Sequence, residues 1–244
     1  MGLRRFCKNF YRKWFLITHQ FIDYRGLSTP IRRSGMNSDV LMHLYEGIYE
    51  RPEITGLSRT IRPGDRILEL GAGLGIISAL AARAAGPQGR VLAYEANAAL
   101  LDDTLAFFVA NQITTVDLVN AVLVPEANPA PRRLHLAGSF AESSLLGAQG
   151  RDPQGEVAVK AECLSEVLAS FRPDVLICDI EGAEAELLSA LPPSSLRVAV
   201  VEMHPDRLSA AEIQSIHDAM AVQGLHPQTP GPGGTVVIYA KAAA

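Results

Sequence analysis

Arg66-Ile-Leu-Glu-Leu-Gly-Ala-Gly-Leu-Gly-Ile-Ile-Ser78 is the stretch of sequence that decides the fold. Its first part, residues 67–70, is mostly apolar and is typical of a buried parallel strand. Three glycines then indicate a tight turn, and the alanine-rich residues Ile76–Ala85 favour a helix. A strand, a glycine loop and a helix in this order predict the first unit of a doubly wound, nucleotide-binding α/β fold.

The spacing of the glycines indicates which ligand the loop binds. Gly71, Gly73 and Gly75 follow the pattern G-x-G-x-G, whereas a dinucleotide fingerprint has its third glycine one position later. Glu69 precedes the loop, where a carboxylate repels a pyrophosphate but attracts an ammonium or sulfonium group. The loop therefore predicts S-adenosyl-L-methionine (SAM) as the ligand.

A second acid supports this interpretation. Glu95 ends the next apolar run, about twenty residues beyond the loop, which is the distance at which an acid meets the ribose hydroxyls of a nucleotide. The alternative is a glycine turn beside a surface glutamate. The predicted cofactor-binding residues are Glu69, Gly71, Ala72, Gly73, Gly75, Glu95, Ala96 and Asn120.

Length, charge and cysteine content limit the possible classes of protein. The chain has 244 residues, enough for one α/β domain with an appendage. Its net charge of -4 argues against general nucleic-acid binding. Cys7, Cys163 and Cys178 lack metal-ligand spacing and are interpreted as free thiols in a reducing compartment. No apolar run reaches the roughly 20 residues that span a bilayer, so we expect a cytoplasmic protein.

The N-terminal segment, residues 1–33, is strongly basic and contains Asp23 as its single acid. The spacing of its apolar residues predicts an amphipathic helix over residues 3–22. The apolar face of this helix comprises Phe6, Phe10, Trp14, Ile17 and Phe21. The helix is expected to dock on its own domain or on a second subunit of a homo-oligomer, and the alternative is peripheral contact with an anionic membrane. Removal of the segment is expected to leave SAM binding intact.

The rest of the chain alternates between strand and helix patterns. Helices are expected at residues 40–48, 98–109, 164–171, 184–191 and 210–222. Strands are expected at residues 90–94, 116–124, 134–136, 156–160, 175–178, 197–201 and 235–239. This order predicts a mostly parallel sheet, and the last strand is expected to join it as an antiparallel member.

Candidate catalytic residues follow two of these strands. Asp179 and Glu181 come directly after residues 175–178, and His204 follows residues 197–201. The carboxyl ends of neighbouring parallel strands meet at one edge of a sheet, which is where doubly wound folds bind their ligands. We therefore expect Asp179, Glu181 and His204 to lie close together.

Together these motifs resemble the FkbM family of SAM-dependent methyltransferases over about residues 45–205. The main marker is Asp179-Ile-Glu-Gly-Ala-Glu184 after an apolar strand, supported by the glycine loop, Glu95-Ala-Asn97, Asn111 and Glu202-Met-His-Pro205. The resemblance implies a Rossmann-like class I methyltransferase domain over residues 56–244, preceded by a helical extension over residues 1–55. It also implies methyl transfer to a hydroxyl oxygen of a small metabolite, sugar, glycan or polyketide-like acceptor.

The sequence departs from the family pattern in two places. Glu69 and Gly73-Leu74 stand where the family commonly has Asp and an Asn-Ile pair, and the first of these changes keeps the charge. Ile177 stands where many members have lysine. Any role that depends on that cation cannot be carried over to this chain.

Methyl transfer to a hydroxyl requires that the hydroxyl lose its proton, to a base or with the help of a metal. Asp179, Glu181 and His204 are the candidates for the base. One coherent arrangement has His204 as the base, with Asp179 as its orienting partner or as the acceptor of a substrate hydroxyl. The alternative for His204 is a structural histidine beside Pro205. Glu181 and Glu184 can also be explained as negative charges that stabilise the first turn of a helix, and for Glu184 we prefer this explanation. As an alternative, Asp179, Glu181 and Glu202 with His204 could hold a divalent cation, because carboxylates at strand ends suit Mg²⁺, but a metal is not the prediction. The alternative functions are a noncatalytic SAM-fold subunit, a membrane-docked scaffold or a nicotinamide-dependent oxidoreductase.

Overall fold

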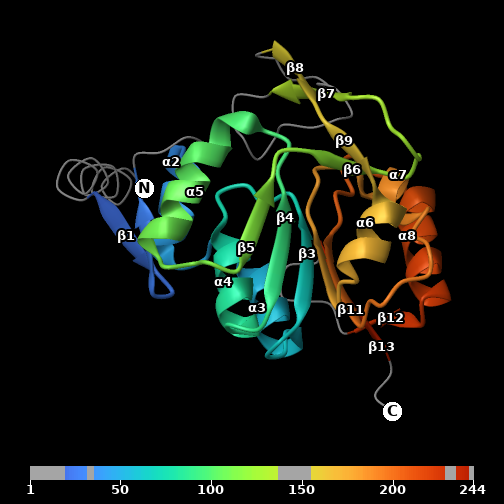
Figure 1. Ribbon diagram of the computed structural model, residues 1–244, viewed down its shortest axis with the longest axis horizontal. Coiled ribbons are helices and arrows are strands. Elements are labelled where there is room, and N and C mark those ends of the chain that lie inside the picture. Colours follow the sequence, from blue (N-terminus) through green and yellow to red (C-terminus); the bar gives the residue numbers. More distant parts are fainter. Residues whose placement is uncertain (1–19, 32–35, 137–154, 229–234, 242–244) are drawn as a thin grey trace, which may run out of the picture.

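A seven-stranded sheet forms the centre of the molecule (Figure 1). The computed structural model describes residues 20–31, 36–136, 155–228 and 235–241. The sheet has the order β12-β13-β11-β10-β3-β4-β5. Its strands are β3 (Arg66–Leu70), β4 (Arg90–Tyr94), β5 (Val116–Val119), β10 (Val175–Cys178), β11 (Val198–Glu202), β12 (Leu225–Pro227) and β13 (Val236–Lys241). Strands β11, β10, β3, β4 and β5 pair in parallel, whereas β13 is antiparallel to both of its neighbours.

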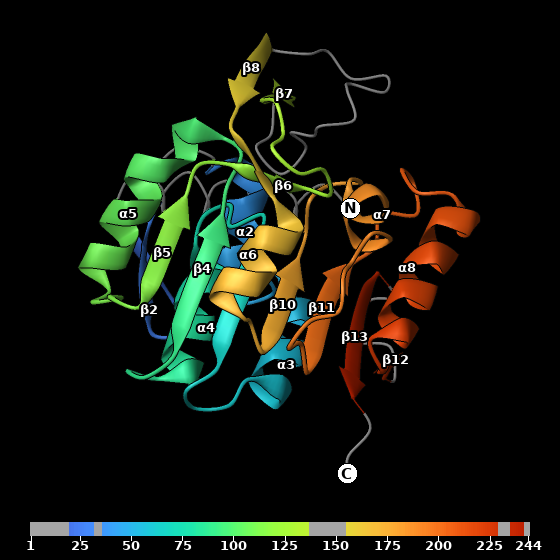
Figure 2. The ribbon, with the colours of Figure 1, turned by 45° about the vertical axis from the view of Figure 1, so that its right-hand side comes forward.

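Helices cover both faces of the sheet (Figure 2). They are α2 (Ser38–Glu46), α3 (Arg51–Thr60), α4 (Ile76–Ala85), α5 (Leu101–Ala110), α6 (Leu164–Phe171), α7 (Glu184–Leu188) and α8 (Ala210–Val222), with a short 3-10 turn at Ala98–Leu100. Successive strand residues point to opposite faces, so Ile67 joins the core under α2 to α5 and Leu68 joins the core under α6 to α8. The doubly wound, mostly parallel fold and its antiparallel late strand are therefore confirmed.

The strand predicted over residues 116–124 is wrong, because two strands occupy this stretch. The chain leaves the main sheet after β5, and β6 (Val122–Val124) pairs with β9 (Ala161–Cys163) instead. Asn120 causes the break. Its side-chain amide donates hydrogen bonds to the backbone carbonyls of Glu95 (2.8 Å) and Ala96 (3.1 Å) rather than continuing the strand pattern.

The end of the predicted N-terminal helix is also wrong. Phe21–Tyr24 forms strand β1, which pairs antiparallel with β2 (Leu27–Pro30) across a tight turn. The first part of that helix, including four residues of its apolar face, lies outside the described residues. The hairpin joins α5 through Asn111, whose side chain both accepts from and donates to the backbone of Ser28.

Helix α3 was not expected from the sequence. Its residue Gly56 lies against β13, where a Cβ atom would come within 3.1 Å of Ile238. The small residue lets the helix approach the sheet closely but weakens the helical pattern. The predicted boundary between the N-terminal extension and the methyltransferase domain, at residues 55 and 56, would fall inside α3. Tyr24, Leu44 and Tyr49 belong to the same hydrophobic core as the central strands.

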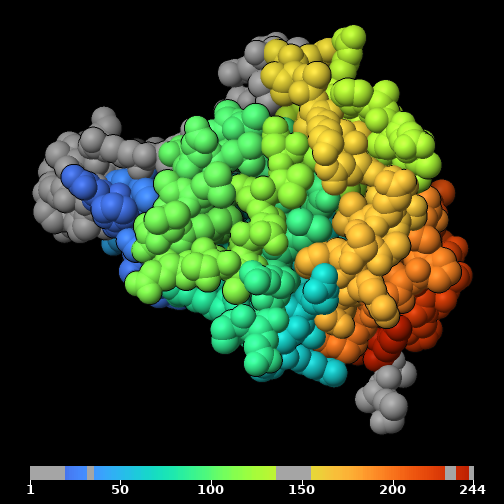
Figure 3. Space-filling view, viewed as in Figure 1, coloured from blue at the N-terminus to red at the C-terminus, as the bar shows by residue number. Residues whose placement is uncertain are grey.

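A second hairpin stands above the carboxyl ends of the parallel strands. Strands β7 (Arg132–Leu136) and β8 (Gly155–Val159) pair antiparallel, which confirms the two short strands expected in this region. Figure 3 shows the hairpin projecting from the body of the molecule at the top of the view. Within the described ranges, no helix is both long and apolar enough to cross a membrane.

Candidate functional site

The glycine loop lies at the carboxyl end of β3, beside the end of β10. Gly71 has a φ of 88°, and a Cβ atom at this position would lie 1.8 Å from the backbone carbonyl oxygen of Asp179. Only glycine permits this approach. The backbone N–H groups of Gly71 and Ala72 donate to the carbonyl of Tyr94, so the loop is also tied to β4. The loop therefore brings the ends of three strands together.

Glu95 fixes the outer part of the loop. One of its carboxylate oxygens accepts a hydrogen bond from the backbone N–H of Gly73, and the other accepts from that of Asn97, both at 2.7 Å. The side chain is only 8% exposed, and burial raises its pKa while these hydrogen bonds oppose the shift. Asn120, which bonds the backbone of Glu95 from behind, supports this arrangement.

One cavity of about 450 Å³ connects the loop to the candidate catalytic residues. Gly71, Gly73, Glu95 and Ala96 line one part of it. The carboxylates that line the rest are Asp39, Glu50, Asp179, Glu181, Glu186 and Glu202. Among the described residues that line the cavity, none is lysine or arginine. A glycine-walled, anionic cavity of this kind fits a ligand that carries an ammonium and a sulfonium group.

Four of the predicted cofactor-binding residues do not line the cavity. Ala72, Gly75 and Asn120 lie behind its wall, and Glu69 is only 1% exposed. Glu69 lies beneath α4, beside Ser78. Burial raises the pKa of Glu69 to about 8, although the hydrogen bond with Ser78 acts in the opposite direction. In this structure Glu69 is part of the core below the loop rather than of the cavity wall.

Ile177 explains why Glu69 has no cationic partner among the described residues. Ile177 is paired with Glu69 across strands β10 and β3, so the two side chains lie on the same face of the sheet. Ile177 is 4% exposed and belongs to the apolar core. A buried carboxyl beside an apolar side chain favours its protonated form.

This buried carboxyl predicts a pH-dependent stability. The folded protein retains the proton on Glu69 up to about pH 8, whereas an unfolded chain releases it near the ordinary value of 4.5. Between these values the folded state binds more protons, so we expect the free energy of unfolding to fall as the pH rises. Glu69→Gln should reduce this slope by about 1 kcal/mol per pH unit. Urea unfolding from pH 5 to 8 measures the effect.

The matched control for this experiment is Glu166→Gln on the exposed side of α6. It removes a carboxylate from the surface and should leave the slope unchanged. A slope that is the same in Glu69→Gln and in the wild type would contradict the prediction. Glu50 and Glu53, whose pKa values burial raises to about 8 and about 7, should keep part of the pH dependence in every variant.

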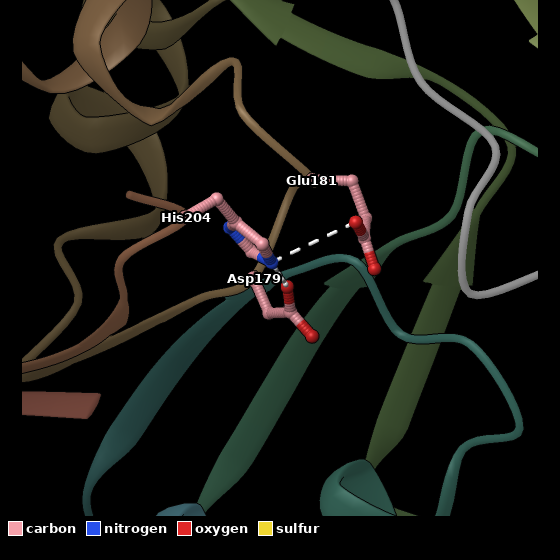
Figure 4. Close-up of side chains that lie close together, drawn as sticks. All are labelled: Asp179, Glu181 and His204. Carbon is pink, nitrogen blue, oxygen red and sulfur yellow. Dashed lines mark ion pairs between the residues drawn. The ribbon is translucent and has the colours of Figure 1, made fainter. Parts of the chain in front are cut away.

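Asp179, Glu181 and His204 meet as expected, and we call these three residues the acid–histidine cluster (Figure 4). The Nε2 atom of His204 lies 3.6 Å from Oδ1 of Asp179 and 3.6 Å from Oε2 of Glu181. The meeting follows from the parallel pairing of β10 with β11, which places their ends side by side. Arg207 holds Glu181 from outside, with Nη1 2.9 Å from Oε2.

Glu184 has a role that helical charge alone does not explain. It is fully buried, and its Oε1 accepts hydrogen bonds from the backbone N–H groups of Ile180 (3.2 Å) and Gly182 (3.1 Å). The same oxygen lies 2.9 Å from Nδ1 of His204. Glu184, rather than Asp179, therefore orients the imidazole. The sequence contains one signal for this role, which is that Glu184 comes two residues after a glycine. An acid in the first turn of a helix is explained more simply by the favourable charge at the helix N-terminus.

Charge within the cluster alters the pKa values of its members. Burial lowers the pKa of His204, but the hydrogen bond with Glu184 and the neighbouring carboxylates raise it to about 9. Burial, followed by the charge of Glu202, raises the pKa of Asp179 well above its ordinary value. The carboxyl groups around His204 therefore favour its protonated form, while its burial opposes that form.

Comparison with known proteins settles the family. The sequence profile of the Methyltransferase FkbM domain matches residues 69–224, which include the glycine loop, Glu95 and the acid–histidine cluster. The chain belongs to the FkbM methyltransferase family. Membership makes SAM its cofactor, and the cavity described above contains the residue types that SAM requires. No curated protein matches the sequence of this FkbM methyltransferase.

Several solved structures are similar to this chain at low sequence identity. Precorrin-6y C5,15-methyltransferase from Geobacter metallireducens GS-15 has 13% identity and a TM-score of 0.46, covering 80% of this chain and 89% of its own. Ribosomal protein L11 methylase from Lactobacillus delbrueckii subsp. bulgaricus has 13% identity and a TM-score of 0.47, covering 80% and 77%. Fibrillarin from Aeropyrum pernix with natively bound SAM has 13% identity and a TM-score of 0.40, covering 73% and 66%. These likenesses are too distant to indicate an acceptor for the FkbM methyltransferase.

Proposed function

We propose that this protein transfers the methyl group of SAM to a hydroxyl oxygen of a small, uncharged acceptor. The observation that carries the proposal is the single cavity that joins Gly71, Gly73 and Glu95 to Asp179 and Glu181. SAM supplies an electrophilic methyl group when it is bound. The protein's main task is to hold an acceptor oxygen in line with that group, because positioning alone contributes about 7–11 kcal/mol in favourable cases.

The cofactor part of the cavity is assigned to the loop and to Glu95. Gly71 and Gly73 present backbone without side chains, so a ligand can approach the loop closely. Glu95 retains acceptor capacity on both carboxylate oxygens, because an ionised carboxylate has about four lone-pair sites and two are in use. The remaining sites suit ribose hydroxyls, as the sequence predicted.

Glu95→Ala should weaken SAM binding by about 1–3 kcal/mol, because the ribose hydroxyls and the N–H of Gly73 both lose an acceptor. Calorimetric titration with SAM and with its demethylated product measures the effect without any acceptor. Asp102→Ala in the first turn of α5 is the matched control and should bind as the wild type does. Equal affinity in Glu95→Ala and the wild type would reject the assignment.

Asp179 is the residue we assign to the hydroxyl proton. Asp179 and Glu181 line the cavity, whereas His204 does not. Both ring nitrogens of His204 face carboxylates, Nδ1 toward Glu184 and Nε2 toward Asp179 and Glu181. The roles first expected are therefore exchanged in this proposal. His204 positions the carboxylate, and Asp179 meets the acceptor.

Charge supports an uncharged acceptor. Glu50, Asp179, Glu181 and Glu202 line the same cavity as the glycine loop. An anionic acceptor such as a phosphorylated metabolite or a nucleic acid would find no lysine or arginine to pair with among the described residues of the wall. Neutral hydroxyl groups can donate to these carboxylates. The acceptor proposed is therefore a neutral polyhydroxylated compound such as a sugar or polyketide.

Labelled methyl transfer tests the proposal. The full-length protein is incubated with methyl-labelled SAM and separately with neutral hydroxylated extracts, phosphorylated metabolites and RNA. We expect label in an alkali-stable methyl ether from the neutral fraction. Preferential labelling of the phosphorylated metabolites or the RNA would overturn the acceptor class, and labelling of nitrogen or carbon would overturn the reaction type.

A further inference from the structure

We propose that Asp179, Glu181 and His204 form a binding site for one divalent metal ion, for which Mn²⁺ is the most suitable probe. Each of the three residues offers one ligand atom, and these atoms all lie within 4.8 Å of one another. They come from the ends of two adjacent parallel strands, so the sheet holds their backbones in place (Figure 4).

The separations of the ligand atoms fit a single ion. Two atoms that each bind one ion at about 2.1 Å can be no more than about 4.2 Å apart. Nε2 of His204 lies 3.6 Å from each carboxylate oxygen, which needs no movement of the imidazole. Only the distance between Asp179 and Glu181 could require a small side-chain adjustment.

The orientation of His204 is typical of a metal ligand. In most metal sites the second ring nitrogen of a histidine donates to a carboxylate, which fixes the ring and leaves the first nitrogen for the ion. Glu184 supplies this carboxylate, with Oε1 2.9 Å from Nδ1 of His204. Glu184 is fully buried and held by two backbone N–H groups, so the ring orientation is set before any ligand binds.

Asp179 provides a separate observation that points to a ligand. Its Oδ1 is shielded from solvent and accepts no hydrogen bond from the described residues, although it is directed toward Nε2 of His204. Nε2 of His204, 3.6 Å away, is too far to donate a hydrogen bond to this oxygen, so the hydrogen-bonding capacity of the oxygen is unused and a bound cation would satisfy it. Glu50 and Glu202 line the same cavity and add further negative charge. A bound divalent ion would balance this charge.

The ligand set indicates the class of ion. Two carboxylates favour Mg²⁺ or Mn²⁺, whereas an imidazole favours softer ions than Mg²⁺. Mn²⁺ satisfies both preferences, and Zn²⁺ is the competing possibility. Asp179 and Glu181 line the cavity, so an acceptor hydroxyl could reach an ion held between them and lose its proton more easily. The binding site itself does not depend on which acceptor is methylated.

Electron paramagnetic resonance tests the site directly, because free Mn²⁺ gives a six-line signal that bound Mn²⁺ loses. The full-length protein, without SAM or acceptor, should bind one Mn²⁺ per chain. Asp179→Asn, Glu181→Gln and His204→Gln should each weaken binding at least tenfold. Glu186→Gln removes a carboxylate from the same cavity but outside the cluster, and should leave Mn²⁺ affinity unchanged. Competition with Mg²⁺ and Zn²⁺ ranks the ions.

Two results would overturn the metal site. One is a wild-type protein that binds no Mn²⁺ beyond the level of Asp179→Asn. The other is an equal loss in Glu186→Gln and the cluster variants, which would indicate diffuse attraction to an acidic cavity. Circular dichroism identifies the variants that fold, and any one of the three suffices for the comparison. Mn²⁺ binding without methyl transfer to hydroxyls would retain the site and reject the proposed function.

Discussion

Asp179→Asn should lower the turnover of labelled methyl transfer by about 10²–10⁴-fold, while SAM affinity changes less than twofold. The substitution keeps the size of the side chain and removes the carboxylate that faces the cavity. Asp179 follows the carboxyl end of β10 and lines the cavity, and in our proposal it meets the acceptor whereas Glu95 binds the cofactor. The loss should therefore appear in the chemical step and not in cofactor binding.

The control for this prediction is Asp117→Asn on the exposed face of β5, which removes one carboxylate far from the cavity and should leave turnover unchanged. Calorimetry with SAM and a labelled-transfer assay are run on the same preparations. Unchanged turnover in Asp179→Asn would remove Asp179 from the reaction. A parallel loss of SAM binding would show that the residue serves the cofactor instead.

Gly71→Ala should lower the free energy of unfolding by about 2–5 kcal/mol. The new Cβ atom would lie 1.8 Å from the carbonyl oxygen of Asp179, and that oxygen belongs to the backbone. The end of β10 or the loop has to move, because the backbone fixes the position of Cβ and no rotamer change can relieve its clash with a backbone oxygen. SAM binding should fall with stability, because the loop and Asp179 share the cavity wall.

Gly64→Ala is the matched control for this substitution. Gly64 has a φ of 87°, nearly the same as the 88° of Gly71, so both alanines carry similar backbone strain. No heavy atom lies within 4 Å of a Cβ built at Gly64. The control should therefore lose only about 1 kcal/mol, the cost of a left-handed alanine. Equal losses in the two variants, measured by urea unfolding, would show that the close approach to Asp179 is unimportant.

Local patterns predicted the sheet and most of the helices. Helices α4, α6 and α8 have the predicted bounds, because each combines helix-forming residues with clear ends. The sequence did not predict helix α3, because Gly56 weakens its helical pattern. It also did not predict the hairpin of β1 and β2, because strands of four residues are too short to show a clear alternation of apolar and polar residues. Their positions depend on packing against the sheet rather than on local preference.

The candidate site was predicted as a set of residues but not as a set of contacts. Asp179, Glu181 and His204 meet because β10 and β11 are neighbours, which alternating strands and helices already indicated. The hydrogen bond from His204 to Glu184 was not foreseen, because it joins residues twenty positions apart through a turn whose shape is set by packing. Glu69 satisfies the sequence motif, yet the fold places it beneath α4 rather than at the cavity.

The sequence by itself determined the fold class, the family and the location of the cavity, because glycine spacing and strand-end acids are local properties of the chain. The tertiary structure alone decided which carboxylate orients His204, which acids reach the cavity and which remain buried. Those outcomes depend on the burial and direction of each side chain, and burial is determined by elements distant in sequence. The same residue type therefore serves as a core carboxyl at Glu69, a loop support at Glu95 and a histidine partner at Glu184.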